Sequence, residues 1–475
     1  MSSSPAVNQT KARFTSGSTM RHVLVMCGTG SIGLVSIFLV DFANLFYISL
    51  LGDPMLTAAV GFAGTVLYFH MSFALGLMIA AVALTSRALG AGDPQQARRV
   101  AGSALAIVAI LSGALMLVSM PLIDWMLGIV GAVGETRRLA AWFMLIALPT
   151  TPLFGIAMCL IGILRSAGDA KRSMYATLIL GLVTAVLDPI LIYGLDLGIT
   201  GAAIVMVISR VLTLIYAFGV ATKIHGLIAR PTLSGLKIDF APLARIGVPA
   251  VLTGISIPVS NGYVTAEVAV FGDHAVAGWT IISRLVPLAF GALFAMSGAI
   301  GPIIGQNFGA GAFDRVRRTI IDAIIVTSIY TLIISTVLFL GRDAIVAMFG
   351  ASGEAAELVI FFCQFLAIAY IFNAGLFVSN AAFNNLGFPL VSTLFNWGRA
   401  TLGTIPFVWV GANIAGAEGA LAGFAIGAIP FGIAALFLCR QIIDRLDPDK
   451  QRASRRPFWW SVLSANPDKQ TAPPR

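Results

Sequence analysis

The chain has 475 residues, of which 58% are hydrophobic and 11% are charged, whereas a soluble globular domain is about 45–50% apolar and about 25% charged. A soluble fold of this length has too little interior for so many apolar side chains, so we expect the lipid bilayer to be the solvent. The formal net charge is +9, but the basic residues lie at the ends of apolar segments. This pattern is typical of polytopic membrane proteins and argues against a nucleic-acid partner.

Apolar segments long enough to cross about 30 Å of hydrocarbon follow one another along the chain. The first six lie near residues 22–50, 55–86, 98–122, 138–164, 173–195 and 199–222. After a polar linker, six more lie near residues 243–271, 276–307, 317–340, 355–385, 389–413 and 419–440. These segments predict an all-α polytopic membrane protein with twelve transmembrane helices in two six-helix lobes. The expected domains are a disordered cytoplasmic tail (1–20), an N-lobe (21–222), a cytoplasmic linker (223–240), a C-lobe (241–440) and a basic cytoplasmic tail (441–475).

Positive charges lie in every second connection between these segments. These connections contain Arg87, Arg98, Arg99, Arg165, Lys171, Arg172, Lys223, Arg230, Arg315, Arg317 and Arg318. The alternate connections carry acidic residues such as Asp53 and Asp273, and Arg137, Arg138 and Arg342 are exceptions on that side. The positive-inside rule therefore places both termini in the cytoplasm, and we expect a multi-pass protein of the inner (plasma) membrane.

The two halves of the chain repeat one another at an almost constant spacing. Pairs of matching residues lie 219 positions apart at Gly90 and Gly309, Arg98 and Arg317, Gly131 and Gly350, Gly134 and Gly353, and Gly168 and Gly387. Gly52 and Gly272 lie 220 apart, and Gly198 and Gly416 lie 218 apart. Because each half has an even number of spans, the halves have parallel topology and are related by an axis along the membrane normal. This arrangement predicts two lobes that face each other across a central cavity and rock against one another.

Several short motifs occur along the chain, four in the first half and one in the second. They are Leu51-Gly52-Asp53, Ser86-Arg87-Ala88-Leu89-Gly90-Ala91-Gly92-Asp93, Leu164-Arg165-Ser166-Ala167-Gly168-Asp169-Ala170-Lys171, Gly198-Ile199-Thr200-Gly201 and Pro302-Ile303-Ile304-Gly305-Gln306-Asn307-Phe308-Gly309-Ala310-Gly311. Together they resemble the MATE family, the multidrug and toxic compound extrusion transporters, over roughly residues 20–440. An Asp in the first span and Asp188-Pro189 in the fifth are most similar to the DinF-like branch. The resemblance implies efflux of organic, cationic or amphipathic small molecules, with a proton or a sodium ion as the coupling ion and no other cofactor.

Two carboxylates lie inside apolar segments, where a charge costs several kcal/mol and is usually functional. They are Asp41 in the first span and Asp188 in the fifth. Asn44 and Thr184 lie one turn from them on the same helix faces. We therefore predict a cation-coupling site formed by these four residues, and the two aspartates of the resembled branch take part in cation coupling. The alternatives are a structural carboxylate at the first position and a helix end near water at the second.

Other residues of the apolar segments are candidates to line a substrate cavity. They are Met206, Ser260, Asn261, Arg284, Asn373 and Arg399. The alternative for the polar residues is hydrogen bonding between helices. For the arginines it is snorkelling, or pairing with backbone carbonyls near an interface. Two positions depart from the family pattern, because Thr184 stands where an Asn is common and Met206 stands where a Thr is common.

The competing hypotheses keep the membrane fold. A lipid-linked sugar or lipid flippase, or a dedicated metabolite exporter, would belong to the same superfamily. A channel is the third possibility. A membrane enzyme is not supported, because the sequence has no nucleophile motif, no metal-ligand cluster and no phosphate-binding loop. We therefore expect a monomeric transporter with no catalytic residues and no metal, whose other partners are membrane lipids.

Overall fold

The computed structural model describes residues 12–49 and 51–451, apart from the side chains of residues 40–43, 45 and 49. Helices make up nearly all of this part, and no strand occurs within it. The aromatic residues Phe458-Trp459-Trp460 stand among basic residues, which predicts either an anchor on the inner membrane surface or a disordered tail, but they lie outside the described residues.

The helices fall into two sets along the chain. The N-lobe contains α1 (Thr19–Ser49), α2 (Pro54–Gly90), α3 (Pro94–Ser119), α4 (Ile123–Ile129), α5 (Gly134–Ala147), α6 (Thr151–Ser166), α7 (Ala170–Pro189) and α8 (Gly198–Gly219). The C-lobe contains α9 (Leu233–Ala269), α10 (Asp273–Ala289), α11 (Gly291–Gly309), α12 (Phe313–Phe349), α13 (Glu354–Phe361), α14 (Tyr370–Leu386), α15 (Pro389–Gly398), α16 (Ile405–Leu446) and α17 (Pro448–Gln451). Short 3-10 or π-helical segments interrupt several spans: η1 (Met120–Leu122), η2 (Leu148–Thr150), η3 (Ile190–Gly194), η4 (Val220–Ile224), η5 (Phe362–Leu366), η6 (Ala367–Ala369) and η7 (Arg399–Gly403).

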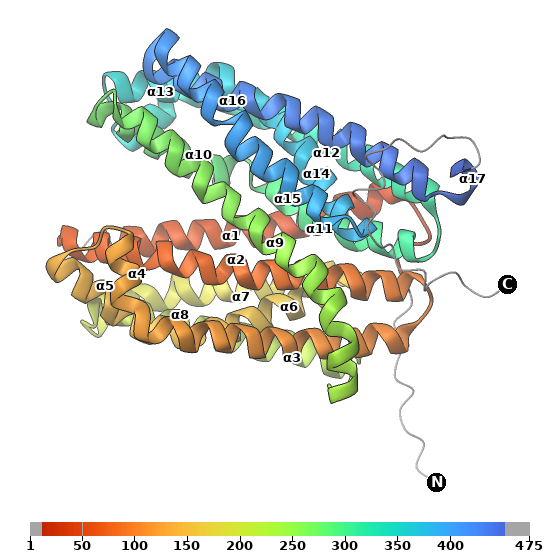
Figure 1. Cartoon of the computed structure of the whole chain (residues 1–475). Coiled ribbons are helices and arrows are strands. Elements are labelled where there is room, and N and C mark those ends of the chain that lie inside the picture. Colours follow the sequence, from red (N-terminus) through yellow and green to blue (C-terminus); the bar gives the residue numbers. More distant parts are fainter. Residues whose placement is uncertain (1–11, 50, 452–475) are drawn as a thin grey trace.

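The two lobes meet at one end of the molecule and diverge toward the other (Figure 1). Both ends of the described chain lie at the meeting end, which we call the terminal end; the opposite end is the distal end. Long α9 passes from contacts with α2 and α3 to contacts with α10 and α15, and so joins the lobes. It begins at Leu233, inside the segment expected to be a linker, where Thr232 accepts a hydrogen bond from the backbone N–H of Gly235.

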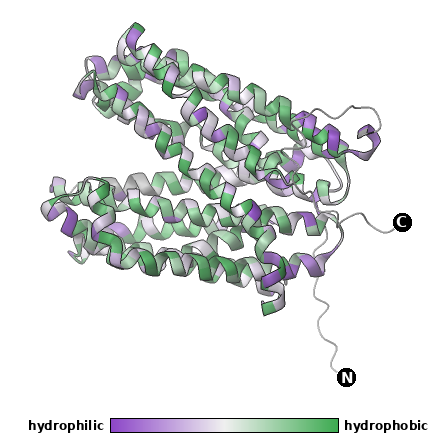
Figure 2. Ribbon diagram, viewed as in Figure 1, coloured by the Kyte–Doolittle hydropathy of each residue, from purple (hydrophilic) through white to green (hydrophobic). Residues whose placement is uncertain are grey.

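Sequence signals explain where several N-lobe helices begin. The carboxylate of Asp53 accepts a hydrogen bond from the N–H of Met55, and that of Asp93 accepts one from the N–H of Gln96. A proline follows each aspartate, and its missing N–H costs nothing in the first turn of a helix. Hydrophobic residues then fill the lengths of the helices, while hydrophilic residues gather at their ends (Figure 2).

The described helices account for twelve membrane spans. Ten segments are long and apolar enough to cross a bilayer, and α10 and α11 form an eleventh across a bend of 42°. The last segment, Pro389–Leu446, holds two spans, because the backbone leaves the helical region at Ala415 and Gly416. After this reversal the chain runs back along itself: a Cβ at Gly419 would overlap the carbonyl of Gly411, and one at Gly427 would overlap that of Gly403. The predicted number of spans is confirmed.

The internal repeat is visible in the backbone. Gly92 and Gly311 both adopt positive φ, at 77° and 70°, a conformation that residues with a Cβ rarely take. The same holds for each of the predicted pairs Gly52–Gly272, Gly131–Gly350, Gly134–Gly353, Gly168–Gly387 and Gly198–Gly416. The helix breaks repeat as well, since η2 and η6 are also 219 positions apart. The two halves therefore share one chain path.

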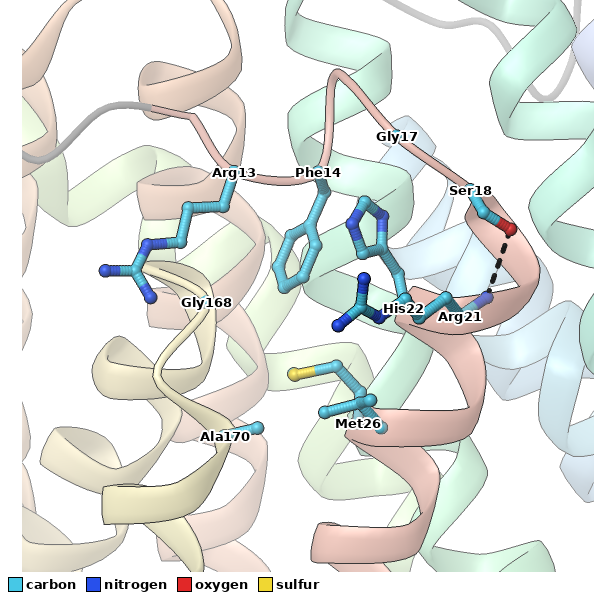
Figure 3. Close-up of a pocket in the computed structure, with 10 residues that line it drawn as sticks. Arg13, Phe14, Gly17, Ser18, Arg21, His22, Met26, Gly168 and Ala170 are labelled. Atoms are coloured by element: carbon cyan, nitrogen blue, oxygen red, sulfur yellow. Dashed lines mark hydrogen bonds between the residues drawn. The ribbon is translucent and has the colours of Figure 1, made fainter.

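Residues 12–18 fall within the segment expected to be a disordered tail, but in the structure they pack across the terminal end (Figure 3). Phe14 is buried beside Gly168 of the N-lobe. Its N–H donates to Oε1 of Gln306 in the C-lobe at 2.8 Å. Arg315 donates to the carbonyls of Phe14 and Gly17, at 2.7 and 2.9 Å. The difference arises because the polar backbone of this segment finds partners on the C-lobe, which local sequence does not reveal.

A pocket of about 290 Å³ lies beneath this segment. Figure 3 shows the ring of Phe14 between the side chains of Arg13 and His22, with Met26 below it. The pocket is at the terminal end and is separate from the buried carboxylate described next.

Candidate functional site

The buried carboxylate of Asp188 is the centre of the candidate site. Its side chain is fully buried, with 0% exposure, although it lies 18 residues along α7, about 27 Å from the start of that helix. The protein interior, rather than water at a helix end, therefore surrounds this group. A buried ionised carboxylate is unfavourable unless it is paired or neutralised.

Asn44 of α1 is the described partner of this carboxylate. Its Nδ2 donates to Oδ2 of Asp188 at 2.9 Å. The other oxygen, Oδ1, is buried and has no hydrogen-bond partner among the described residues. An unsatisfied buried acceptor can take up a proton, or coordinate a small cation, without displacing an existing partner. The two helices approach closely, since a Cβ at Gly33 of α1 would overlap the hydroxyl of Thr177 in α7.

The backbone after Asp188 is irregular. Pro189 removes a helical N–H donor, and the next five residues form the π-helix η3. The hydroxyl of Tyr193 in this segment donates to the carbonyl of Tyr47, so η3 also contacts α1. π-Helical segments occur frequently at functional sites.

Thr184 lies close in sequence to Asp188 but does not bond to it. Thr184 is buried, and its hydroxyl donates to the carbonyl of Leu180 at 2.9 Å. A threonine in a helix commonly makes this local bond, and it leaves the hydroxyl unavailable as a donor to the carboxylate. The structure therefore brings Asn44 and Asp188 together and leaves Thr184 outside their hydrogen bond. The side chain of Asp41 lies outside the described residues, and its part in the site stays a prediction.

The predicted cavity residues are dispersed. Met206 is half-buried among apolar N-lobe side chains. In the C-lobe, Ser260 is fully buried with an unpartnered hydroxyl, whereas Asn261 and Arg284 are exposed. Asn373 is half-buried, and Arg399 is buried with 9% exposure.

Two other polar residues of the apolar segments have structural partners. Arg210 donates to the carbonyl of Ala147 and the hydroxyl of Thr150, at 3.2 and 2.7 Å. These acceptors belong to the helix break at η2, where carbonyls lose their helical donors. His70 is within hydrogen-bond distance of Ser119, at 3.1 Å, and so links α2 to α3. Both contacts fit packing roles.

The motifs that carry the family resemblance converge where the lobes meet. Nε of Arg87 donates to the carbonyl of Asn385 at 2.8 Å, and Nε2 of Gln306 donates to the carbonyl of Ser166 at 2.7 Å. A Cβ at Gly90 would overlap the carbonyl of Gln306. We call this set of contacts the interlobe seam. Sequence reasoning identified these motifs but did not place them together; their equivalent positions in the two halves were the signal that they lie near the pseudo-two-fold axis.

The interlobe seam also contains close contacts of two glycines of α11 with α2, and the contact of Gly309 is equivalent to that of Gly90. A Cβ at Gly309 would overlap the carbonyl of Arg87, and one at Gly305 would overlap the hydroxyl of Ser86. Only glycine allows the two helices to approach this closely. The terminal end is therefore closed by direct packing of α2 against α11.

No group of three or more potential metal ligands occurs among the described residues.

The chain is similar in sequence to known membrane transporters. A model of the MatE family matches residues 31–190 and 249–410, one block in each lobe. A FAD transporter of Shewanella oneidensis is 26% identical over 434 residues, which cover 89% of this chain and 95% of the relative. The multidrug export protein MepA of Staphylococcus haemolyticus is 24% identical over 413 residues, covering 86% of this chain and 90% of the relative.

Solved structures share the fold. A multidrug resistance MATE family transporter of the MOP superfamily, in an outward-facing conformation, superposes with a TM-score of 0.86 at 22% identity, covering 94% of this chain and 99% of that chain. The MATE transporter VcmN of Vibrio cholerae in its bent form superposes with a TM-score of 0.85 at 24% identity, covering 90% and 98% of the two chains.

Proposed function

Because the chain belongs to the MatE family of membrane transporters, we propose that it exports small organic molecules by alternating access, driven by a proton or sodium ion that binds in the N-lobe. The single observation that carries the proposal is the fully buried Asp188 with one unpartnered carboxylate oxygen. Family membership itself makes the chain a transporter and not an enzyme.

The chemistry of Asp188 suits ion coupling. A charge inside a membrane protein is expensive and is retained mainly on ion or proton pathways. Binding a cation or a proton neutralises the carboxylate, which changes the strength of its hydrogen bond with Asn44. This bond joins α7 to α1, so ion binding alters the contact between two helices of one lobe. We propose that Asp41 contributes to the same site.

Alternating access requires the lobes to separate at the terminal end. The interlobe seam consists of a few hydrogen bonds and glycine contacts, which can break as a unit when one lobe rocks against the other. In the proposed cycle, ion binding in the N-lobe favours the opening of this seam. Both termini would face the cytoplasm, and membership of the DinF-like branch stays a prediction.

The proposed substrates are organic, cationic or amphipathic molecules. The relative MepA is a multidrug export protein, which supports a permissive specificity. The proposed lining consists of Met206, Ser260, Asn261, Arg284, Asn373 and Arg399. A dedicated metabolite exporter is the second candidate, and it is favoured by the buried cation at Arg399 and by the relative that transports FAD.

The test is transport by purified protein in liposomes. Vesicles containing the wild type, Asp188→Asn or Asp41→Asn receive an imposed proton or sodium gradient, and the movement of the fluorescent cation ethidium is followed. We expect gradient-driven transport by the wild type and a loss to the level of empty vesicles in both variants. Asp196→Asn is the matched control, since Asp196 is an exposed aspartate in the loop after η3.

Each outcome is informative. Transport that responds to only one gradient identifies the coupling ion. Undiminished gradient-driven transport by Asp188→Asn would overturn the assignment of the coupling site, because a neutral amide cannot bind and release a proton at neutral pH.

A further inference from the structure

Arg399 is a buried cation near the middle of the membrane. It follows α15, which begins at Pro389 at the terminal end, so it lies about 15 Å along a span that crosses roughly 30 Å of hydrocarbon. Its exposure is only 9%. At this depth the guanidinium cannot reach either aqueous surface by extending its side chain.

The backbone fixes this residue in place. Arg399 begins the π-helix η7, and its carbonyl accepts a hydrogen bond from the hydroxyl of Thr404 at 2.9 Å. On either side of it, a Cβ at Gly398 or at Gly403 would lie less than 3 Å from the ring of Phe431. The segment that carries Arg399 therefore packs tightly against α16, so the position of Arg399 does not depend on a mobile loop.

The guanidinium has no protein partner in the part of the chain that the structure describes. No carboxylate lies within ion-pair distance, and no carbonyl or hydroxyl accepts a hydrogen bond from its nitrogens. Arg210 has the same sequence signal but donates to a carbonyl and a hydroxyl of its own lobe. Arg399 therefore differs from a buried arginine that supports the fold.

Tyr370, at the start of α14, has an electrostatic interaction with Arg399. The ring of Tyr370 stacks on Phe290 with centroids 4.3 Å apart and an interplanar angle of 5°. Phe290 stands at the bend between α10 and α11. A buried guanidinium without an ion-pair partner suits a ligand that carries a negative charge.

We infer that Arg399 binds the anionic group of the transported molecule, so that the C-lobe recognises organic anions. An unpaired buried charge lowers stability, and its retention is explained if a ligand supplies the counter-charge during transport. The inference rests on the proposed function and develops its second candidate, the dedicated metabolite exporter, by naming organic anions as the substrate class. It also separates two roles, because ion coupling lies in the N-lobe and substrate charge recognition in the C-lobe.

The test compares two probes that share one ring system and differ in charge. Riboflavin is uncharged, and flavin mononucleotide adds a phosphate to it. Equilibrium binding of each probe to the purified full-length protein is measured by quenching of flavin fluorescence, for the wild type, Arg399→Gln, Arg399→Lys and the matched control Arg440→Gln. Arg440 is an exposed arginine of α16 in the same lobe.

We expect the wild type to bind flavin mononucleotide at least about tenfold more tightly than riboflavin. A charge-assisted hydrogen bond between Arg399 and the phosphate accounts for a difference in affinity of this size. Arg399→Gln should lose this preference, Arg399→Lys should keep part of it, and Arg440→Gln should keep all of it. An equal affinity of the wild type for the two probes, or an unchanged preference in Arg399→Gln, would overturn the inference.

The binding assay separates this inference from the proposed function. If the charge preference depends on Arg399 but no gradient drives any probe across liposomes, the anion site stands and the coupled-export proposal fails. If gradients drive ethidium but the wild type shows no charge preference between the flavins, the export proposal stands and the anion site fails. Thermal unfolding of each variant without probe confirms that the substituted proteins are folded.

Discussion

Arg87 and Gln306 occupy equivalent positions in the two halves of the chain, and each donates a hydrogen bond to a backbone carbonyl of the opposite lobe. Their acceptors, Asn385 and Ser166, are equivalent to each other as well. The two lobes are thus joined by one contact that the pseudo-two-fold axis repeats. An asymmetric side-chain pair, arginine and glutamine, performs the same linking role twice.

We predict that removing either donor opens the terminal end. Gln306→Ala or Arg87→Ala leaves a buried carbonyl without its partner, at a cost of about 1–3 kcal/mol. Spin labels at Gln95 and Lys450, which are exposed residues of opposite lobes at this end, should report a longer distance by pulsed electron resonance. Arg138→Ala, which removes an exposed ion pair with Glu135, is the control and should leave the distance distribution unchanged. Identical distributions in all variants would show that the interlobe seam does not set the conformation.

A second prediction concerns the packing of the last two spans. Gly427→Ala places a methyl group against the carbonyl of Gly403 and should lower the unfolding free energy by about 1–3 kcal/mol. Gly341 lies within α12 with open space around its Cα, so Gly341→Ala should stabilise the protein by up to about 1 kcal/mol. Thermal unfolding in detergent measures both. A Gly427→Ala variant as stable as Gly341→Ala would contradict the described packing.

Asp169 supports a prediction about pH. It caps α7 and accepts hydrogen bonds from His225 and Arg172, at 2.6 and 2.7 Å. Burial acts against the charged form, but these hydrogen bonds outweigh it and hold the pKa of Asp169 well below its usual range. A lowered pKa gives stability that is present above the unfolded-state value of about 3.9 and is lost as the pH falls below it.

The lowered pKa of Asp169 determines how the stability should depend on pH. Asp169→Asn should be less stable than the wild type by about 1–3 kcal/mol at pH 7, and the difference should shrink as the pH falls below about 4. Thermal unfolding across this pH range tests it. A difference that grows toward acid would contradict the assignment.

The segment at residues 12–18 supports a prediction about proteolysis. Arg315 donates to the carbonyls of Phe14, Ser16 and Gly17, so Arg315→Gln should release the segment and expose the peptide bond after Arg13 to trypsin. We expect cleavage there to be about tenfold faster than in the wild type, since protection falls with the stability of the closed form. Arg98→Gln, on an exposed residue of α3 at the same end, is the control. Equal cleavage rates would show that Arg315 does not hold the segment.

The features that sequence predicted well are those that the bilayer or the backbone enforces. Twelve spans follow from apolar length, and the paired glycines follow from turns that need positive φ, as at Gly92 and Gly311. Side-chain partnerships were harder to predict. Nothing local distinguishes Arg210, which binds a broken helix, from Arg399, which has no described partner. In the same way, helical spacing placed Thr184 beside Asp188, but the hydroxyl bonds to its own backbone instead.

The contact between Phe14 and Gln306 has a consequence for the order in which the protein is made. These residues are separated by 292 positions, so residues 12–18 can meet Gln306 only after the whole N-lobe and the first helices of the C-lobe have been synthesised. The N-lobe helices are already inserted by then, and residues 12–18 must wait beside them. Their docking on the C-lobe therefore follows the synthesis of the N-lobe, and a chain truncated before Gln306 cannot form this hydrogen bond.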